Sequence, residues 1–430
     1  MDYNIETIKL DVTAFVGFQI KKQADVRKLH DILIENDIDV GFNTLRRLYQ
    51  FLPYSQPRSK TLNSLSRFLG YRNYNQYQNS LFQNNNWSGW LATNRIELTD
   101  HLDTNEIEDL LALQSNPNYF QMLFAVIKAF NYRNRIDLLS ILFSHESLFK
   151  PDDRFNSEGL KIAYFFLNSL HLKSKKEIES YYPLLKKGSV FKTQILDLFI
   201  DYRHLTGYYG QLTEERLKTE SDPASILFCQ LLLNYRLFLN GREDFKKVNF
   251  NPPINQLPSV LIGRYISYQI IYLHYKKGES IKRLFEKLLP KIINKDDVFI
   301  FIEIIPALLF IKDFEKIDVI INRNYENLFD HSPWNNYVHQ CLYLIACSLS
   351  DLKKGDLKPA QTTMSIINLE KMEGTAYFEY TALFYHIAQY HIEKSTKNRP
   401  HKLNEVKDKY TALRRATGFK RFSTTFLKNY

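Results

Sequence analysis

From about residue 100 onward, the chain is a succession of apolar segments with helical spacing, separated by short polar breaks. Apolar residues that recur every three or four positions predict amphipathic helices. The breaks recur at intervals of 34, 37, 34 and 43 residues, at Gly207, Gly241, Gly278, Lys312-Asp313 and Gly355. A period of this size is typical of stacked helical hairpins. The sequence therefore predicts an α-solenoid in this region, and a non-repetitive helical bundle is the open alternative.

The scarcity of turn residues points to the same fold class. Only 14 glycines and 14 prolines occur among 430 residues, fewer than a many-stranded β protein needs, while 44% of the residues are hydrophobic. A chain of this length exceeds one ordinary core, so two or more domains or an elongated repeat array are expected. We therefore predict an all-α protein.

The best-formed repeat unit lies between Trp334 and Leu369. Its first predicted helix leads to a turn at Gly355, and Ala360 follows in the second helix. This unit resembles a tetratricopeptide repeat. The resemblance implies that Gly355 closes the turn between the two helices, that Ala360 lets the helices pack closely, and that Trp334 corresponds to the tryptophan of the first helix.

The N-terminal part has its own set of predicted helices. Residues 24–35 form one amphipathic stripe, Asn43 is a good N-cap for a helix from Thr44 to about Leu52, Ser59 caps a helix over 61–69 that Gly70 ends, and residues 74–82 form a fourth. The amide-rich run 83–94 separates these helices from the repeats. We predict a head over residues 1–85, a junction over 86–99 and a helical-repeat domain over 100–430 with a basic capping helix, Thr411 to Tyr430, at its end.

The distribution of charge in the head favours binding to a polyanion. Residues 1–96 carry 12 Lys and Arg against 8 Asp and Glu, and no acidic residue occurs between Asp39 and Glu97. In the predicted helix after Asn43, the apolar positions face inward and leave Thr44, Arg46, Arg47 and Gln50 facing outward. Cations without opposing carboxylates suit the phosphates of nucleic acid, and a solvated surface without a partner is the alternative.

The runs Phe42 to Leu48 and Thr61 to Tyr71, with Pro57 between them, resemble the later half of lambda-repressor-like (Cro-type) helix-turn-helix domains. The resemblance implies a recognition helix from Asn43 to Gln50 that enters the major groove of DNA. Arginine suits guanine or phosphate, and glutamine suits adenine. The predicted DNA-binding residues are Asn43, Thr44, Arg46, Arg47, Gln50, Arg58 and Lys60.

No motif for catalysis, phosphate binding or metal binding occurs in the chain, so we expect neither an enzyme nor a cofactor. The three cysteines have no disulfide or zinc spacing, and the N-terminus has no secretory pattern, which favours a cytoplasmic protein. No segment is long and apolar enough to predict a membrane partner.

These features predict a transcriptional regulator whose head binds duplex DNA and whose helical repeats bind a peptide or protein ligand, an order of domains that looks like that of peptide-responsive bacterial regulators. A homodimer is an open alternative because helix-turn-helix domains commonly act as dimers. Two other functions stay open. One is a non-catalytic interaction scaffold with a vestigial head, and the other is RNA binding by the basic C-terminal end, with Phe419, Phe422 and Tyr430 as stacking platforms.

Overall fold

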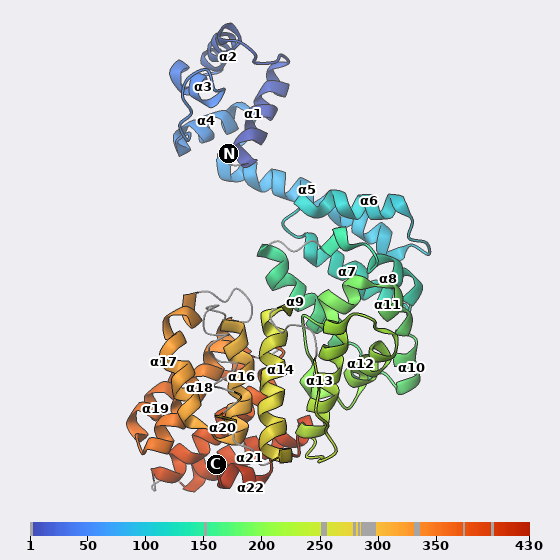
Figure 1. Cartoon of the computed structure of the whole chain (residues 1–430). Coiled ribbons are helices and arrows are strands. Elements are labelled where there is room, and N and C mark those ends of the chain that lie inside the picture. The colour runs from blue at the N-terminus through green and yellow to red at the C-terminus, as the bar shows by residue number, and fades with distance from the viewer. Residues whose placement is uncertain are drawn as a thin grey trace. The chain divides into compact units, whose positions relative to one another are not determined.

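The computed structural model of the chain describes residues 3–149, 153–250, 256–277, 281–282, 284, 298–330, 336–372, 375–396 and 400–430. Over these residues the regular structure is helical and includes no strand, which confirms the all-α prediction (Figure 1). The chain divides into two compact units. One comprises Met1–Thr99 and Glu108–Leu123, and the other comprises Asp100–Ile107 and Phe124–Tyr430.

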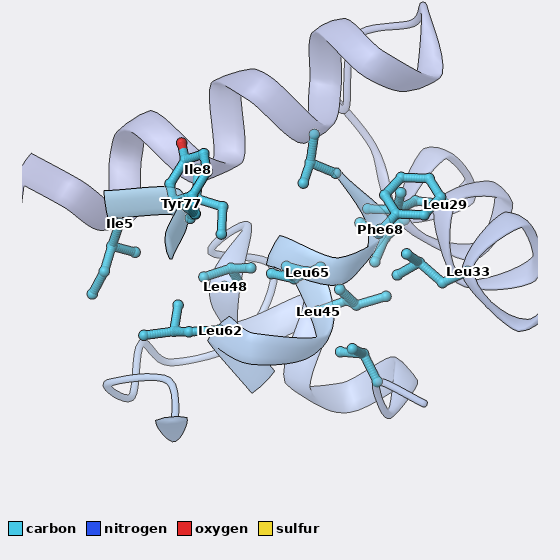
Figure 2. Close-up of a cluster of buried hydrophobic side chains, with 13 residues drawn as sticks. Ile5, Ile8, Leu29, Leu33, Leu45, Leu48, Leu62, Leu65, Phe68 and Tyr77 are labelled. Atoms are coloured by element: carbon cyan, nitrogen blue, oxygen red, sulfur yellow. The ribbon is translucent and has the colours of Figure 1, made fainter. Parts of the chain in front are cut away.

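The first unit begins with helices that bury leucine and isoleucine against one another. These are α1 (Tyr3–Val16), α2 (Gln23–Glu35), α3 (Phe42–Leu48), α4 (Ser59–Phe68) and α5 (Tyr74–Leu98). Their shared core includes Ile5, Ile8, Leu29, Leu33, Leu45, Leu48, Leu62, Leu65, Phe68 and Tyr77, drawn as sticks in Figure 2. The prediction of a helix over 24–35 is confirmed by α2. Helix α1 has no counterpart among the predicted helices, although Ile5, Ile8 and Val12 repeat with helical spacing.

Two helix ends in the head differ from the prediction. Helix α3 begins at Phe42 with Gly41 as its N-cap and ends at Leu48, so Asn43 lies inside the helix instead of capping it. Helix α4 begins at Ser59 itself, after an N-cap at Arg58 that offers no side-chain acceptor. Asn43 and Ser59 are therefore inside the first turn of their helices instead of at the N-cap position, because packing of the buried leucines outweighs a cap worth about 1 kcal/mol. Gly70, at φ 89°, follows the end of α4 as predicted.

The stretch predicted as a polar junction is helical. Helix α5 runs on from Tyr74 through most of residues 86–99 and ends at Leu98. Asn73 caps its start, where the side chain accepts a 2.9 Å hydrogen bond from the backbone N–H of Gln76. No proline interrupts α5, and asparagine and glutamine cost only tenths of a kcal/mol each in a helix, so the polar composition does not break it.

The described helices after α5 are all shorter than α5. They are α6 (Thr104–Ala112), α7 (Tyr119–Tyr132), α8 (Ile136–Leu142), α9 (Asp153–Asn168), α10 (Lys175–Glu179), α11 (Tyr182–Lys187), α12 (Tyr208–Thr219), α13 (Pro223–Leu239), α14 (Ser259–Tyr272), α16 (Val298–Ile311), α17 (Phe314–Asp330), α18 (Asn336–Lys354), α19 (Leu357–Ser365), α20 (Phe378–Ser395), α21 (Pro400–Thr417) and α22 (Thr424–Lys428). Short 3-10 or π turns occupy Leu113–Ser115, Glu146–Phe149, Phe191–Leu196, Tyr202–His204, Leu273–Lys277 and Leu369–Met372.

The predicted breaks coincide with helix ends wherever the structure describes them. Gly241 and Gly355 adopt φ of 70° and 90° after α13 and α18, and Lys312 adopts 60° between α16 and α17. This left-handed conformation ends a helix and is easiest for glycine. Gly207 is the N-cap of α12. Gly278 lies outside the described residues, as does Trp334.

The α18–α19 hairpin shows the close packing expected around Ala360. Its side chain has no exposed surface, and its carbonyl accepts a 3.2 Å hydrogen bond from Ser348 Oγ of α18. Replacing Ala360 with phenylalanine is expected to lower the free energy of unfolding by about 1 to 3 kcal/mol, because a phenyl ring is larger than the methyl group and forces the two helices apart. Urea unfolding followed by circular dichroism measures the change, and an unchanged midpoint would show that the hairpin interface has room for the ring.

Helices of the second unit pack mainly on their neighbours in the chain, from α12 on α13 through to α20 on α21. The end of the chain departs from this order. The backbone N–H of Arg421 donates to the carbonyl of Leu239 at the end of α13 (3.0 Å), and the hydroxyl of Tyr430 donates to the carbonyl of Leu309 in α16 (2.8 Å). The predicted single helix from Thr411 to Tyr430 is also divided, because Gly418 at φ 71° separates α21 from α22.

Candidate nucleic-acid interface

Helix α3 presents a short polar face beside the core of the head. Leu45 and Leu48 are fully buried, whereas Asn43 and Arg47 are exposed and Thr44 is half-buried. The inward and outward positions therefore follow the predicted amphipathic pattern over the length of the helix.

Arg46 is held in place by two neighbours on its own helix. Its Nη1 donates a 3.2 Å hydrogen bond to Asn43 Oδ1, and its guanidinium carbon lies 5.7 Å from the centre of the Phe42 ring. The Nε atom is enclosed without a hydrogen-bond partner. These contacts restrict the rotamers of a long side chain, so less conformational entropy is lost when its guanidinium meets an anion.

The Phe42 ring brings a second cation to the same place. Arg27 of α2 lies 5.3 Å from the ring centre, and the His30 ring is 5.6 Å away in an edge-on arrangement. Cation–aromatic contacts of this kind are worth about 0.5 to 1 kcal/mol at exposed sites. Arg27 is exposed and was not among the predicted DNA-binding residues. Arg27 and Phe42 are 15 positions apart in the sequence, so helical spacing does not predict their contact.

Gln50 does not lie on the helix that was predicted to present it. Helix α3 ends at Leu48, Tyr49 is the C-cap, and Gln50 has φ 62° in the left-handed region. Its backbone N–H donates to the carbonyl of Arg47 (3.1 Å), and that of Phe51 donates to the carbonyl of Arg46 (2.7 Å). This turn satisfies the last carbonyls of α3, which is why α3 is shorter than the helix that the sequence pattern predicts.

Arg58 and Lys60 lie at the start of α4, and both are exposed. Lys60 Nζ is 3.2 Å from Asp39 Oδ2 in a fully solvated ion pair, which is easily exchanged for a phosphate. Among the described residues, no carboxylate forms an ion pair with Arg27, Arg46, Arg47 or Arg58. Arg27, Arg46 and Arg47 lie on the contacting helices α2 and α3 and are called the arginine face below; no described carboxylate neutralises them.

The basic C-terminal end has a different structure. Phe419 and Phe422 are buried, and the Tyr430 hydroxyl is bonded inside the helical unit. Arg421 pairs with Glu243 (2.9 Å) and stacks on Phe238. The aromatic residues suggested as platforms for RNA bases therefore form the core under α21 and α22.

Comparisons with models of protein families, with curated proteins and with solved structures found no match. In the part of the chain that the structure describes, no helix combines the length and apolarity needed to cross a membrane. Nor does any group of three or more His, Cys, Asp or Glu side chains in that part have an arrangement that would hold a metal ion.

Proposed function

We propose that the head binds duplex DNA through the arginine face and that the protein acts as a transcriptional regulator. The observation that carries the proposal is the pairing of Arg27 and Arg46 over the Phe42 ring, with Arg47 exposed next to them. Two contacting helices thereby present three cations that no described carboxylate neutralises.

A polyanion is the partner that suits such a surface. Each arginine that replaces a condensed counterion on duplex DNA favours association, and this contribution does not depend on sequence. Arg46 is fixed by Asn43 and Phe42 and suits a phosphate oxygen, which positions the protein. Arg47 is exposed and unrestrained by any described ion pair, so it is the better candidate for reading a guanine edge.

The test is a titration of labelled duplex DNA with the wild-type chain and with the Arg46→Ala/Arg47→Ala variant at two salt concentrations. If one arginine reads a base, the variant should lose about 1 to 3 kcal/mol on the preferred site and less on other sequences. For each arginine that holds only phosphate, the slope of log affinity against log salt should fall by about one.

A matched control removes the same charge elsewhere. Arg414→Ala/Arg415→Ala deletes an adjacent arginine pair from α21 and should change duplex affinity less than twofold. Equal affinity of the wild type and the Arg46/Arg47 variant would contradict the proposal and favour the interaction scaffold. A larger loss in the control would transfer nucleic-acid binding to the C-terminal end. The peptide or protein ligand of the helical repeats, and homodimerisation, stay predictions.

A further inference from the structure

The second unit contains a cavity of about 510 Å³ that is partly open to solvent. The first turns of α13, α14 and α16 form much of its wall, with additions from α9, α18, the N-cap of α20 and the segment after the π turn. The lining is mainly apolar and includes Leu160, Phe228, Val260, Leu261, Phe299 and Ile302. Its size and composition are typical of sites for small organic ligands, which combine apolar walls with a few fixed polar groups.

Arg264 of α14 is the one cation among the described residues of the lining. It is only 8% exposed, and its guanidinium carbon lies 5.7 Å from the centre of the Phe228 ring. Nη2 makes both of its hydrogen bonds, to Glu303 Oε1 (3.0 Å) and to the Tyr377 hydroxyl (2.9 Å). Nε is enclosed without a partner, and Nη1 donates to none of the described residues. A buried guanidinium with unused donors is costly unless an acceptor reaches it.

The carboxylates of the lining are already engaged. Glu303 accepts from Arg264 and from the Tyr377 hydroxyl. Asp197 accepts two hydrogen bonds from Arg216 (2.5 and 3.2 Å), and Asp222 caps α13 through the N–H of Ser225 (2.7 Å).

The balance of charge restricts the ligand. The lining contains three carboxylates, Asp197, Asp222 and Glu303, against the single guanidinium of Arg264. Arg216 pairs with Asp197 and Arg264 with Glu303, so three carboxylates against two guanidinium groups leave one net negative charge beside the cavity. A ligand carboxylate would add a further negative charge there, whereas an uncharged oxygen would not. The unused groups are donors, so the ligand must supply an acceptor. A ketone, ester or amide oxygen satisfies both conditions.

From this geometry we infer that the cavity binds an uncharged, mainly apolar small molecule whose carbonyl oxygen accepts a hydrogen bond from Arg264 Nη1. The inference is independent of DNA binding by the head. It assigns the second unit a ligand of its own.

The probe for the test is the neutral naphthyl ketone dye Prodan, titrated against the full chain by calorimetry and by its emission shift. We expect one saturable site per chain and blue-shifted emission. Ala224→Phe fills the cavity from the first turn of α13 and keeps Arg264 unsubstituted, and it should weaken binding at least tenfold. The control Ala412→Phe makes the same substitution at an exposed position of α21 and should leave binding unchanged.

Two ligand comparisons test the chemistry without altering the protein. The Prodan analogue with a methylene in place of the carbonyl should bind about tenfold more weakly, since it leaves Arg264 without an acceptor. The anionic naphthalene dye 8-anilinonaphthalene-1-sulfonate should also bind at least tenfold more weakly. Prodan binding that survives Ala224→Phe would overturn the site. Equal affinity for the methylene analogue or the sulfonate would overturn the proposed ligand class.

Discussion

Replacing Glu303 with leucine is expected to lower the free energy of unfolding by about 3 to 5 kcal/mol. The carboxylate accepts hydrogen bonds from Arg264 and from the Tyr377 hydroxyl, and both charged side chains of the pair are less than a tenth exposed. Without Glu303, the Arg264 guanidinium is buried and unpaired, and removing one partner of a buried ion pair has this cost. Urea unfolding followed by far-ultraviolet circular dichroism measures the loss.

The double variant Arg264→Met/Glu303→Leu is the control for this explanation. Replacement of a whole buried ion pair by apolar side chains is often close to neutral, so the double variant should recover most of the stability that Glu303→Leu loses. If the double variant loses as much unfolding free energy as the two single variants together, the explanation by a stranded charge is contradicted. Such additivity would mean that the cost comes from packing and not from the stranded charge.

Replacing Gly263 with alanine is expected to cost about 3 kcal/mol, at the upper end for overpacking. Helix propensity alone predicts the opposite sign, since alanine is about 1 kcal/mol better than glycine inside a helix. A β-carbon at Gly263 would lie 2.8 Å from the Ile300 carbonyl oxygen and 2.8 Å from Glu303 Cβ. These atoms belong to the backbone and the stem of α16, so α14 and α16 must separate to admit the methyl group.

The contrasting substitution is Gly89→Ala in α5. Its β-carbon would meet only the ends of side chains, Met122 Cε at 2.9 Å and Sδ at 3.1 Å and Asn116 Nδ2 at 3.2 Å. A methionine terminus moves at little cost, so the propensity gain should dominate and the variant should be neutral or stabilised by up to about 1 kcal/mol. Thermal unfolding of both variants decides the point. Equal effects on the midpoint would show that the α14–α16 contact is less tight than the distances indicate.

The fold class followed from the sequence because it depends on local patterns. Helical spacing and the scarcity of glycine and proline are both local, and so are the helix ends at Gly241 and Gly355. The predicted starts of α3 and α4 were wrong, because the capping side chains Asn43 and Ser59 competed with the packing of buried leucines. Asn43 has the better capping side chain, yet α3 begins at Phe42 because the helix is placed by its buried leucines.

The candidate sites were less accessible from the sequence, since their residues meet through tertiary contacts. Arg46 and Arg47 were recognisable from the outward face of one helix, but Arg27 joins them only through the Phe42 ring. The Arg264–Glu303–Tyr377 cluster is still harder to predict from the sequence. Its hydrogen bonds connect positions 39 and 113 residues apart, and no spacing rule predicts which of many arginines and glutamates will meet.

The return of the chain's end to α13 affects how the second unit unfolds. In an open row of repeats each hairpin contacts only its neighbours, so the terminal repeats can unfold without the middle ones. Here the Arg421 side chain reaches the carbonyl of Phe238, 183 residues earlier, and Tyr430 is bonded to α16. The last helices cannot detach without opening the middle of the unit. Amide hydrogen exchange in α13, α16 and α22 should therefore proceed through one shared opening event, as a single cooperative foldon.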